Sequence, residues 1–371
     1  MLGTFGTNRV PARSHQGGLT LIELMIAMVI GLVLIGTVIS VFLGMRATYS
    51  YQEALSRVQE NGRFATQFLA RELRMAGYTG CSNNIFNWLN PAGSGYVTSI
   101  YGDRTVTGWD ASSTAPGDSY IAGTSTTWTS STGEAVPAEI GTVLPGSDII
   151  IVNSSEPLDV ELQGNPGPPA NTVNAADATG IPQGAIIMAV TSSCAGGDLW
   201  MKTSNENASS LPKGTAAGHS PGNINPSGGF TQEYDDDSNI YRWTSTAFFL
   251  RTNASTPPEP ALYRLRLDEA KRTGTANPQE LVAGVESMQI AYGVDDDADR
   301  EVDRYLSAAV VPDWAAVHAV RIALLLRNDT RVPTETELTD FTLAHTTITP
   351  TEENRARQVM TLTVALRNEL P

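Results

Sequence analysis

The chain has 371 residues, and its 39 acidic and 24 basic side chains give a formal net charge of −15. That balance argues against nucleic-acid binding, because proteins that bind phosphate backbones rely on clustered Lys and Arg. The length allows one or two globular domains with a sizeable core. Lysine is scarce while Thr, Ser, Gly and Asn are plentiful, a composition that favours a β-rich domain outside the cytoplasm.

The N-terminal segment predicts a membrane span. Arg9 and Arg13 precede an apolar run, and residues 24–45 carry no charge. A helix of that length rises about 33 Å, enough to cross a hydrocarbon core of about 30 Å. The two arginines favour a cytoplasmic N-terminus and translocation of the rest of the chain. An ordinary secretory signal has a shorter apolar core and a small-x-small cleavage site, and this segment has neither.

Glu23, near the start of the apolar run, is not explained by a plain anchor. A charged and unpaired acid in lipid is costly, so an acid at this place is a functional candidate. The alternative is that Glu23 lies near the interface and complements the positive end of the helix dipole. That alternative gives no reason for Gly17 and Gly18 just before it.

The stretch GGLTLIEL, residues 17–24, resembles the class III leader of type IV pilins and type II secretion pseudopilins. In that family a membrane peptidase cuts after a glycine and methylates the new N-terminus, and a glutamate is the fifth mature residue. The resemblance implies a leader at 1–18, cleavage after Gly18, a mature N-terminus at Leu19, and Glu23 as the fifth residue. Leu19 replaces the Phe or Met often found there, but it is apolar, as the pattern requires.

This resemblance implies that Glu23 acts between chains. Once subunits leave the lipid and bundle their helices, the Glu23 carboxylate can face the Leu19 amine of a neighbouring subunit. A charge pair in an apolar bundle is stable only when both partners are present. We therefore expect Glu23 to act as an assembly check and not as a catalyst.

Beyond Arg46 the helical pattern continues and becomes amphipathic. One face carries apolar residues at three- and four-residue spacing, namely Tyr51, Leu55, Val58, Ala65, Leu69, Leu73 and Ala76. Gly77 stands where a helix C-terminus favours a left-handed glycine. We predict one helix over about residues 20–76, half in lipid and half packed on a domain. The chain then divides into an N-terminal helix at 19–77 and a globular head at 78–371.

The head is predicted to be rich in β-strands. Gly, Ser, Thr, Asn and Pro dominate residues 80–230, and the short apolar runs between them are typical of strands. The C-terminal third is more regular. Strands are expected at 147–155, 184–193, 247–252, 261–267, 285–294, 319–328 and 358–368, with a short turn or helix at 312–317. The predicted fold class is α+β, with an antiparallel sheet packed against the helix.

The two cysteines, Cys81 and Cys194, are too far apart for a zinc knuckle, and neither belongs to a CxxC motif. In an oxidising compartment two cysteines most simply form one disulfide. The alternative is a pair of buried free thiols.

An acidic stretch at 292–305 is a candidate calcium loop, with alternating acids at Asp295, Asp297, Asp299, Glu301 and Asp303. Calcium prefers several oxygen ligands from such a loop. The match to an EF-hand is partial, because Arg300 replaces its glycine and Leu306 replaces its last glutamate. The alternative is a solvated acidic turn.

No constellation of residues predicts catalysis, so we expect a protein that is not an enzyme. Residues 218–222, GHSPG, match Gly-x-Ser-x-Gly, but a nucleophile elbow needs a strand before the serine and a helix after it. Here Pro and Gly surround the motif, which makes a chance match the better interpretation. The four histidines have no metal-ligand spacing.

Three more features resemble the PilW-type minor pilins. They are LARELRMAGYTGC at 69–81, the acidic stretch at 292–305, and the pair VRIALLLRN at 320–328 and VMTLTVALRN at 359–368. The length also suits a minor subunit with a large head. The middle of the chain matches only loosely.

The resemblance implies a minor pilin that helps prime pilus assembly and enters the fibre in the tip complex. Because the apical subunit of such complexes often lacks the acid, Glu23 predicts a place below the apex. The implied partners are other minor pilins, the major pilin, a large tip-associated adhesin, the prepilin peptidase and the inner-membrane assembly platform. The head would lie in the periplasm and later on the cell-surface pilus.

Two other functions stay open. A minor pseudopilin of a type II secretion system shares the leader and the fold. A membrane-anchored exported enzyme or binding domain would need a convergent pocket with a nucleophile or base, and the sequence shows none.

Overall fold

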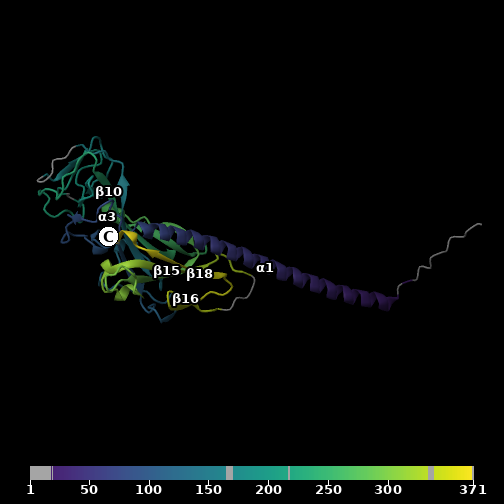
Figure 1. Ribbon diagram of the computed structural model, residues 1–371. Helices are drawn as coiled ribbons and strands as arrows, with labels where there is room; N and C mark the ends of the chain where they lie inside the picture. Colours follow the sequence, from purple (N-terminus) through teal and green to yellow (C-terminus); the bar gives the residue numbers. More distant parts are fainter. Residues whose placement is uncertain (1–17, 19, 164–169, 216–217, 333–337, 370–371) are drawn as a thin grey trace, which may run out of the picture. The chain divides into compact units, whose positions relative to one another are not determined.

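The computed structural model describes residues 18, 20–163, 170–215, 218–332 and 338–369, and the chain divides into two units, 1–50 and 51–371 (Figure 1). Helix α1 (Leu21–Met75) contributes residues 21–50 to the first unit and 51–75 to the second. The prediction of a single helix over about residues 20–76 is confirmed.

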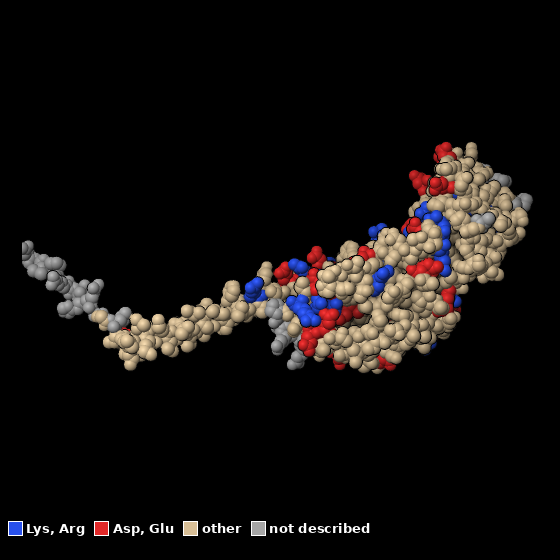
Figure 2. Space-filling view, turned by 180° about the vertical axis from the view of Figure 1, so that it is seen from behind, with Lys and Arg blue, Asp and Glu red and all other residues tan. Residues whose placement is uncertain are grey.

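The described part of the first unit is an apolar helix without cover. The large apolar side chains from Leu21 to Met45 are each between 48% and 79% exposed. By length and composition, this part of α1 suffices to cross a membrane. Figure 2 shows the same segment in tan, with almost no charge on the visible face.

In the second unit, α1 buries the face that its periodicity predicts. Val58, Ala65, Leu69 and Leu73 are at most 1% exposed and belong to the largest core cluster. Leu55 is half-buried, whereas its neighbour Ala54 is buried. Near residue 55, the buried face of α1 therefore contains Ala54 in place of the predicted Leu55.

Gly77 follows this helix in the predicted left-handed conformation. Its φ is +71°, and its N–H donates to the carbonyl of Asn153 at 2.8 Å. A Cβ at this position would lie 2.8 Å from Oγ1 of Thr105. Glycine is thus required at position 77 both by the backbone conformation and by the close approach of Thr105.

The second unit contains a four-stranded antiparallel sheet in the order β14-β13-β15-β18. Its strands are β13 (Val285–Val294), β14 (Arg304–Leu306), β15 (Val317–Arg327) and β18 (Arg357–Ala365). On one face, Ile322, Leu324 and Leu326 of β15 join the core cluster that contains the buried face of α1. This arrangement confirms the predicted antiparallel sheet against the helix.

The opposite face of β15 is covered by a three-stranded sheet in the order β16-β17-β3. Its strands are β3 (Ser119–Ile121), β16 (Phe341–Leu343) and β17 (Thr346–Thr349). Ala323 and Leu325 pack there with Leu343 and Ile348. Since both faces of β15 are buried, its sequence is almost continuously apolar.

A nine-stranded sheet forms the rest of the core, in the order β1-β8-β7-β10-β5-β2-β4, with β11 and β12 continuing from β10. The strands are β1 (Ile85–Asn87), β2 (Val106–Ala111), β4 (Trp128–Thr129), β5 (Ile149–Leu158), β7 (Ile186–Val190), β8 (Gly197–Met201), β10 (Asn239–Thr252), β11 (Pro260–Arg266) and β12 (Gln279–Ala283). The β1–β8 pair is parallel, and the other pairs are antiparallel.

The remaining elements are short. A two-stranded sheet pairs β6 (Thr172–Asn174) with β9 (Ser210–Pro212). The short helices are α2 (Thr98–Tyr101), α3 (Leu267–Thr273), η1 (Ala138–Ile140), η2 (Ala308–Val310), η3 (Trp314–Ala316) and η4 (Arg367–Glu369). Helix η3 confirms the short turn or helix expected at 312–317.

Each predicted strand is present. The strand predicted at 285–294 has the bounds of β13, the others have one or both ends shifted, and the largest difference is in β10. The sequence predicted a strand at 247–252, whereas β10 begins at Asn239. Its first half contains Arg242, Thr244 and Ser245. These polar residues interrupt the apolar pattern from which a strand is predicted. This half pairs with β5, and its first four residues also pair with β7, so its backbone groups are satisfied despite the polar side chains.

The carboxylate of Asp148 joins the two large sheets. Its oxygens accept the N–H of Ala111 in β2 at 3.0 Å and the N–H of Ile290 in β13 at 2.8 Å. Burial raises the pKa of Asp148 well above its ordinary value. This buried acid therefore ties the four-stranded sheet to the nine-stranded one.

Candidate functional site

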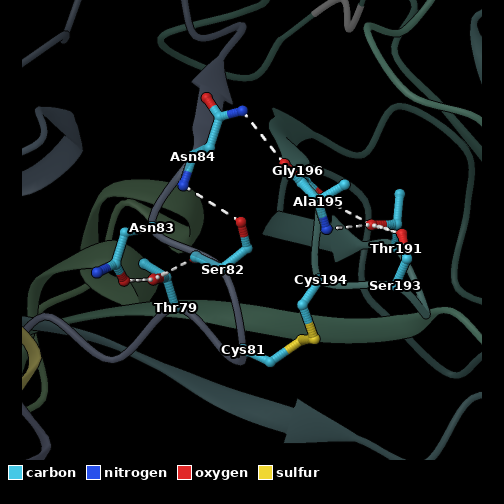
Figure 3. The surroundings of a disulfide bond; sticks show 10 residues. All are labelled: Thr79, Cys81, Ser82, Asn83, Asn84, Thr191, Ser193, Cys194, Ala195 and Gly196. Atoms are coloured by element: carbon cyan, nitrogen blue, oxygen red, sulfur yellow. Dashed lines mark hydrogen bonds between the residues drawn. A yellow bond between two sulfur atoms is a disulfide. The ribbon is translucent and has the colours of Figure 1, made fainter. Parts of the chain in front are cut away.

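Cys81 and Cys194 form a disulfide with a Cα–Cα distance of 5.4 Å, which confirms the predicted bond (Figure 3). Cys81 follows the end of α1, and Cys194 lies in the turn between β7 and β8. Nearby, the Asn84 side chain donates to the carbonyl of Ala195 at 3.3 Å. The disulfide and this hydrogen bond connect the segment after α1 to the nine-stranded sheet.

The predicted processing and assembly residues lie at the start of α1. Gly18 is exposed, and Leu19 lies outside the described residues. The side chain of Thr20 accepts the backbone N–H of Glu23 at 3.3 Å. Thr20 is thus an N-cap with an acid three residues later, a local signal that the sequence prediction missed.

The cap defines what Glu23 does within one chain. As the acid of the first helical turn, Glu23 complements the positive end of the helix dipole. Among the described residues no basic side chain forms an ion pair with Glu23. Within the described chain, the contacts of Glu23 are thus those of the first helical turn.

Three of the five predicted calcium ligands come together in the acidic loop. One carboxylate oxygen from each of Asp295, Asp297 and Asp303 lies within 4.8 Å of the others, whereas Asp299 and Glu301 are not part of this group. The loop connects β13 to β14, so the ends of two paired strands bring these acids together.

Asp295 organises this loop through backbone hydrogen bonds. Its carboxylate accepts the N–H groups of Asp297 at 3.1 Å, Ala298 at 2.7 Å and Arg300 at 2.7 Å. Burial acts to raise the pKa of Asp295, but these hydrogen bonds outweigh it and hold the pKa below its ordinary value. The Asp295 carboxylate thus accepts hydrogen bonds from the loop itself, at the same place where it would be a ligand of a bound cation.

His318 is a neighbour of this loop that sequence reasoning missed. Its Nε2 atom lies 3.4 Å from Oδ2 of Asp295. The two residues are far apart in the sequence and are brought together by the pairing of β13 with β15. No local spacing in the sequence could have revealed this contact.

A second group that the sequence did not reveal is a buried ion-pair network. It joins Arg327, Arg355 and Arg357 to Glu259, Glu286 and Glu352. The shortest contacts are Arg327 to Glu259 and Arg357 to Glu286, both at 2.7 Å. The network fastens the end of β15 and the start of β18 to the residue before β11 and to the start of β13.

The Gly-x-Ser-x-Gly match does not adopt the geometry of a nucleophile elbow. Residues 218–222 contain neither a helix nor a strand. This placement agrees with the interpretation of a chance match.

The comparisons with known proteins identify both ends of the chain. Residues 247–368 match the family described as Type IV Pilus-assembly protein W, and residues 13–39 match the prokaryotic N-terminal methylation motif. No curated protein and no solved structure matches the chain. The first match begins within β10 and includes the whole four-stranded sheet, and the second includes Gly18 and Glu23. Residues 247–368 are thus similar to the PilW-type type IV pilus assembly proteins, and the start of the chain carries the N-terminal methylation motif.

Proposed function

We propose that this protein is a minor pilin that helps prime pilus assembly and enters the fibre within the tip complex, below its apex. The observation that carries the proposal is the arrangement at the start of α1. Glu23 lies five positions after Gly18, has no ion-pair partner in the described chain, and stands in the first turn of an exposed apolar helix. Such a helix needs either lipid or other helices as cover.

The proposal also states how the chain is processed, anchored and moved into the pilus. The prepilin peptidase removes 1–18 and methylates Leu19, leaving the helix at 19–77 and the head at 78–371. Residues 24–45 hold the protein in the inner membrane, with the N-terminus cytoplasmic and the head periplasmic, until the assembly platform moves it into the pilus. Other minor pilins, the major pilin and a large tip-associated adhesin are its partners there.

The first test replaces Glu23 with Ala. We expect Glu23→Ala to insert in the membrane normally and to be absent from sheared pili, because the neighbour's amine would lose its buried counter-ion. Glu53→Ala, which removes an exposed acid elsewhere on α1, is the matched control and should incorporate normally. Normal incorporation of the Glu23→Ala protein would contradict the assembly role.

The second test concerns cleavage. Gly18→Asp should leave a longer, uncut precursor on an immunoblot, and Gly6→Asp, within the leader, should be processed as the wild type is. An anchored enzyme or binding domain that is not a peptidase substrate would show no change in size with either variant. Recovery of the wild-type chain in sheared pili separates a minor pilin from a pseudopilin of a secretion system.

A further inference from the structure

Strand β18 is a long terminal strand of the four-stranded sheet. It has nine residues and pairs only with β15 among the described strands. The terminal strands of the other described sheets have two, three or five residues. Proteins usually protect such an edge with Lys, Pro, a bulge or a short strand. The sequence RQVMTLTVA has no Lys or Pro, and its register with β15 is unbroken.

Hydrogen bonds at both ends of the ladder show which backbone groups face outward. The N–H of Leu366 donates to the carbonyl of His318 at 2.8 Å, and the N–H of Asn328 donates to the carbonyl of Ala356 at 3.1 Å. Bonded pairs alternate in an antiparallel ladder, so the backbone groups of the even-numbered residues of β18 face β15. The N–H and C=O groups of the odd-numbered residues in 357–365 point away from the sheet. They make no backbone hydrogen bond in the part of the chain that the structure describes.

The side chains along this edge indicate what could pair with it. Met360 and Leu362 are half-buried and pack against the core cluster that includes α1, whereas Thr361 and Thr363 are exposed on the other face. Oε1 of Gln358 is buried and has no hydrogen-bond partner among the described residues. Beyond Arg357, which is held by Glu286, the strand carries no charge.

We propose that β18 pairs in the assembled fibre with an extended, uncharged segment of a different pilus subunit. This inference rests on the proposed function. The incoming strand would place apolar side chains beside Met360 and Leu362 and small polar side chains beside Thr361 and Thr363. Its backbone would satisfy the outward groups of β18, as in other cases of strand addition.

A second copy of the chain, paired antiparallel through β18, does not fit. In the head, α1 and β18 run in the same direction, because Gly62 approaches Met360 and Ala76 accepts a hydrogen bond from Asn368 at 2.9 Å. Antiparallel pairing of two β18 strands would place Tyr51, where the chain enters the head, at opposite ends of the pair. The two chains would then enter the pair from opposite ends, which does not fit subunits packed in the same direction along one fibre.

The test compares Thr361→Pro with Thr361→Ala in the full-length chain. Both variants remove the threonine side chain, but only proline removes the outward N–H and obstructs the incoming strand. We expect Thr361→Pro to fall about tenfold in sheared pili, the equivalent of about 1.4 kcal/mol. Thr361→Ala should match the wild type. Membrane level and the Cys81–Cys194 disulfide, seen on a non-reducing gel, report whether each variant folds.

A photo-crosslinking residue at position 361 gives a readout that does not depend on the proline variant. We expect an adduct with a different pilus subunit, identified by mass spectrometry, and none from exposed Thr273 in α3. Equal incorporation of a folded Thr361→Pro variant, no adduct, or an adduct with a second copy would overturn the pairing. Absence of the wild-type chain from pili would instead contradict the proposed function.

Discussion

Among single residues, the buried charges of the ion-pair network have the largest energetic consequences. Glu286 contacts Arg357 at 2.7 Å and Arg327 at 3.5 Å, and all three side chains are at most 7% exposed. Removing one partner from such a group leaves an uncompensated buried charge. Replacing the whole group with apolar residues would carry no such cost.

We expect Glu286→Gln to lower the free energy of unfolding by about 3–5 kcal/mol. Glu53→Gln is the matched control, since its pair with Arg57 is exposed and should contribute less than about 1 kcal/mol. Chemical denaturation of the full chain in detergent, followed by tryptophan fluorescence, measures both. A loss below about 1 kcal/mol for Glu286→Gln would show that the network is not stabilised by this carboxylate.

Among the elements, the acidic loop between β13 and β14 already holds its shape with its own hydrogen bonds. Asp295 accepts three backbone N–H groups, and Asp296 pairs with Arg304 at 2.7 Å. These contacts favour the solvated acidic turn over a loop that needs calcium to fold.

We therefore expect calcium to leave the melting temperature of the chain almost unchanged relative to EDTA. Asp295→Ala should lower that temperature without any calcium, because three N–H groups lose their acceptor. Differential scanning calorimetry measures both effects. A calcium-dependent rise that disappears in Asp297→Ala and Asp299→Ala would instead establish a calcium site.

The elements themselves were predictable to different degrees. Helix α1 was evident because its apolar spacing and Gly77 are local signals. The first half of β10 was missed because its polar residues are tolerated only between paired strands. His318 and Asp295 are likewise distant in sequence, and only strand pairing brings them together.

For the molecule as a whole, the Cys81–Cys194 disulfide closes a loop across 113 positions. Cross-linking residues this far apart removes much of the freedom of the unfolded chain. The loop contains β1 to β7, so the constraint acts on a large part of the nine-stranded sheet.

We expect the double variant Cys81→Ser and Cys194→Ser to lose about 2–5 kcal/mol of stability. The loss should appear as a lower denaturant midpoint for the full chain in detergent. Adding a reductant should lower the midpoint of the wild type but not that of the double variant. An unchanged midpoint in the double variant would show that the disulfide does not stabilise the head.

The apolar helix, its glycine end, the leader motif and seven of the longer strands could be read from the sequence alone, because each depends on residues close together in the chain. Three features became visible only in the folded chain: Asp148 joins two sheets, six charged residues form one network, and β18 ends the four-stranded sheet as its long edge strand. They depend on contacts between segments that are distant in the sequence. Local propensity and hydropathy do not specify such contacts, so the packing of the whole head determines them.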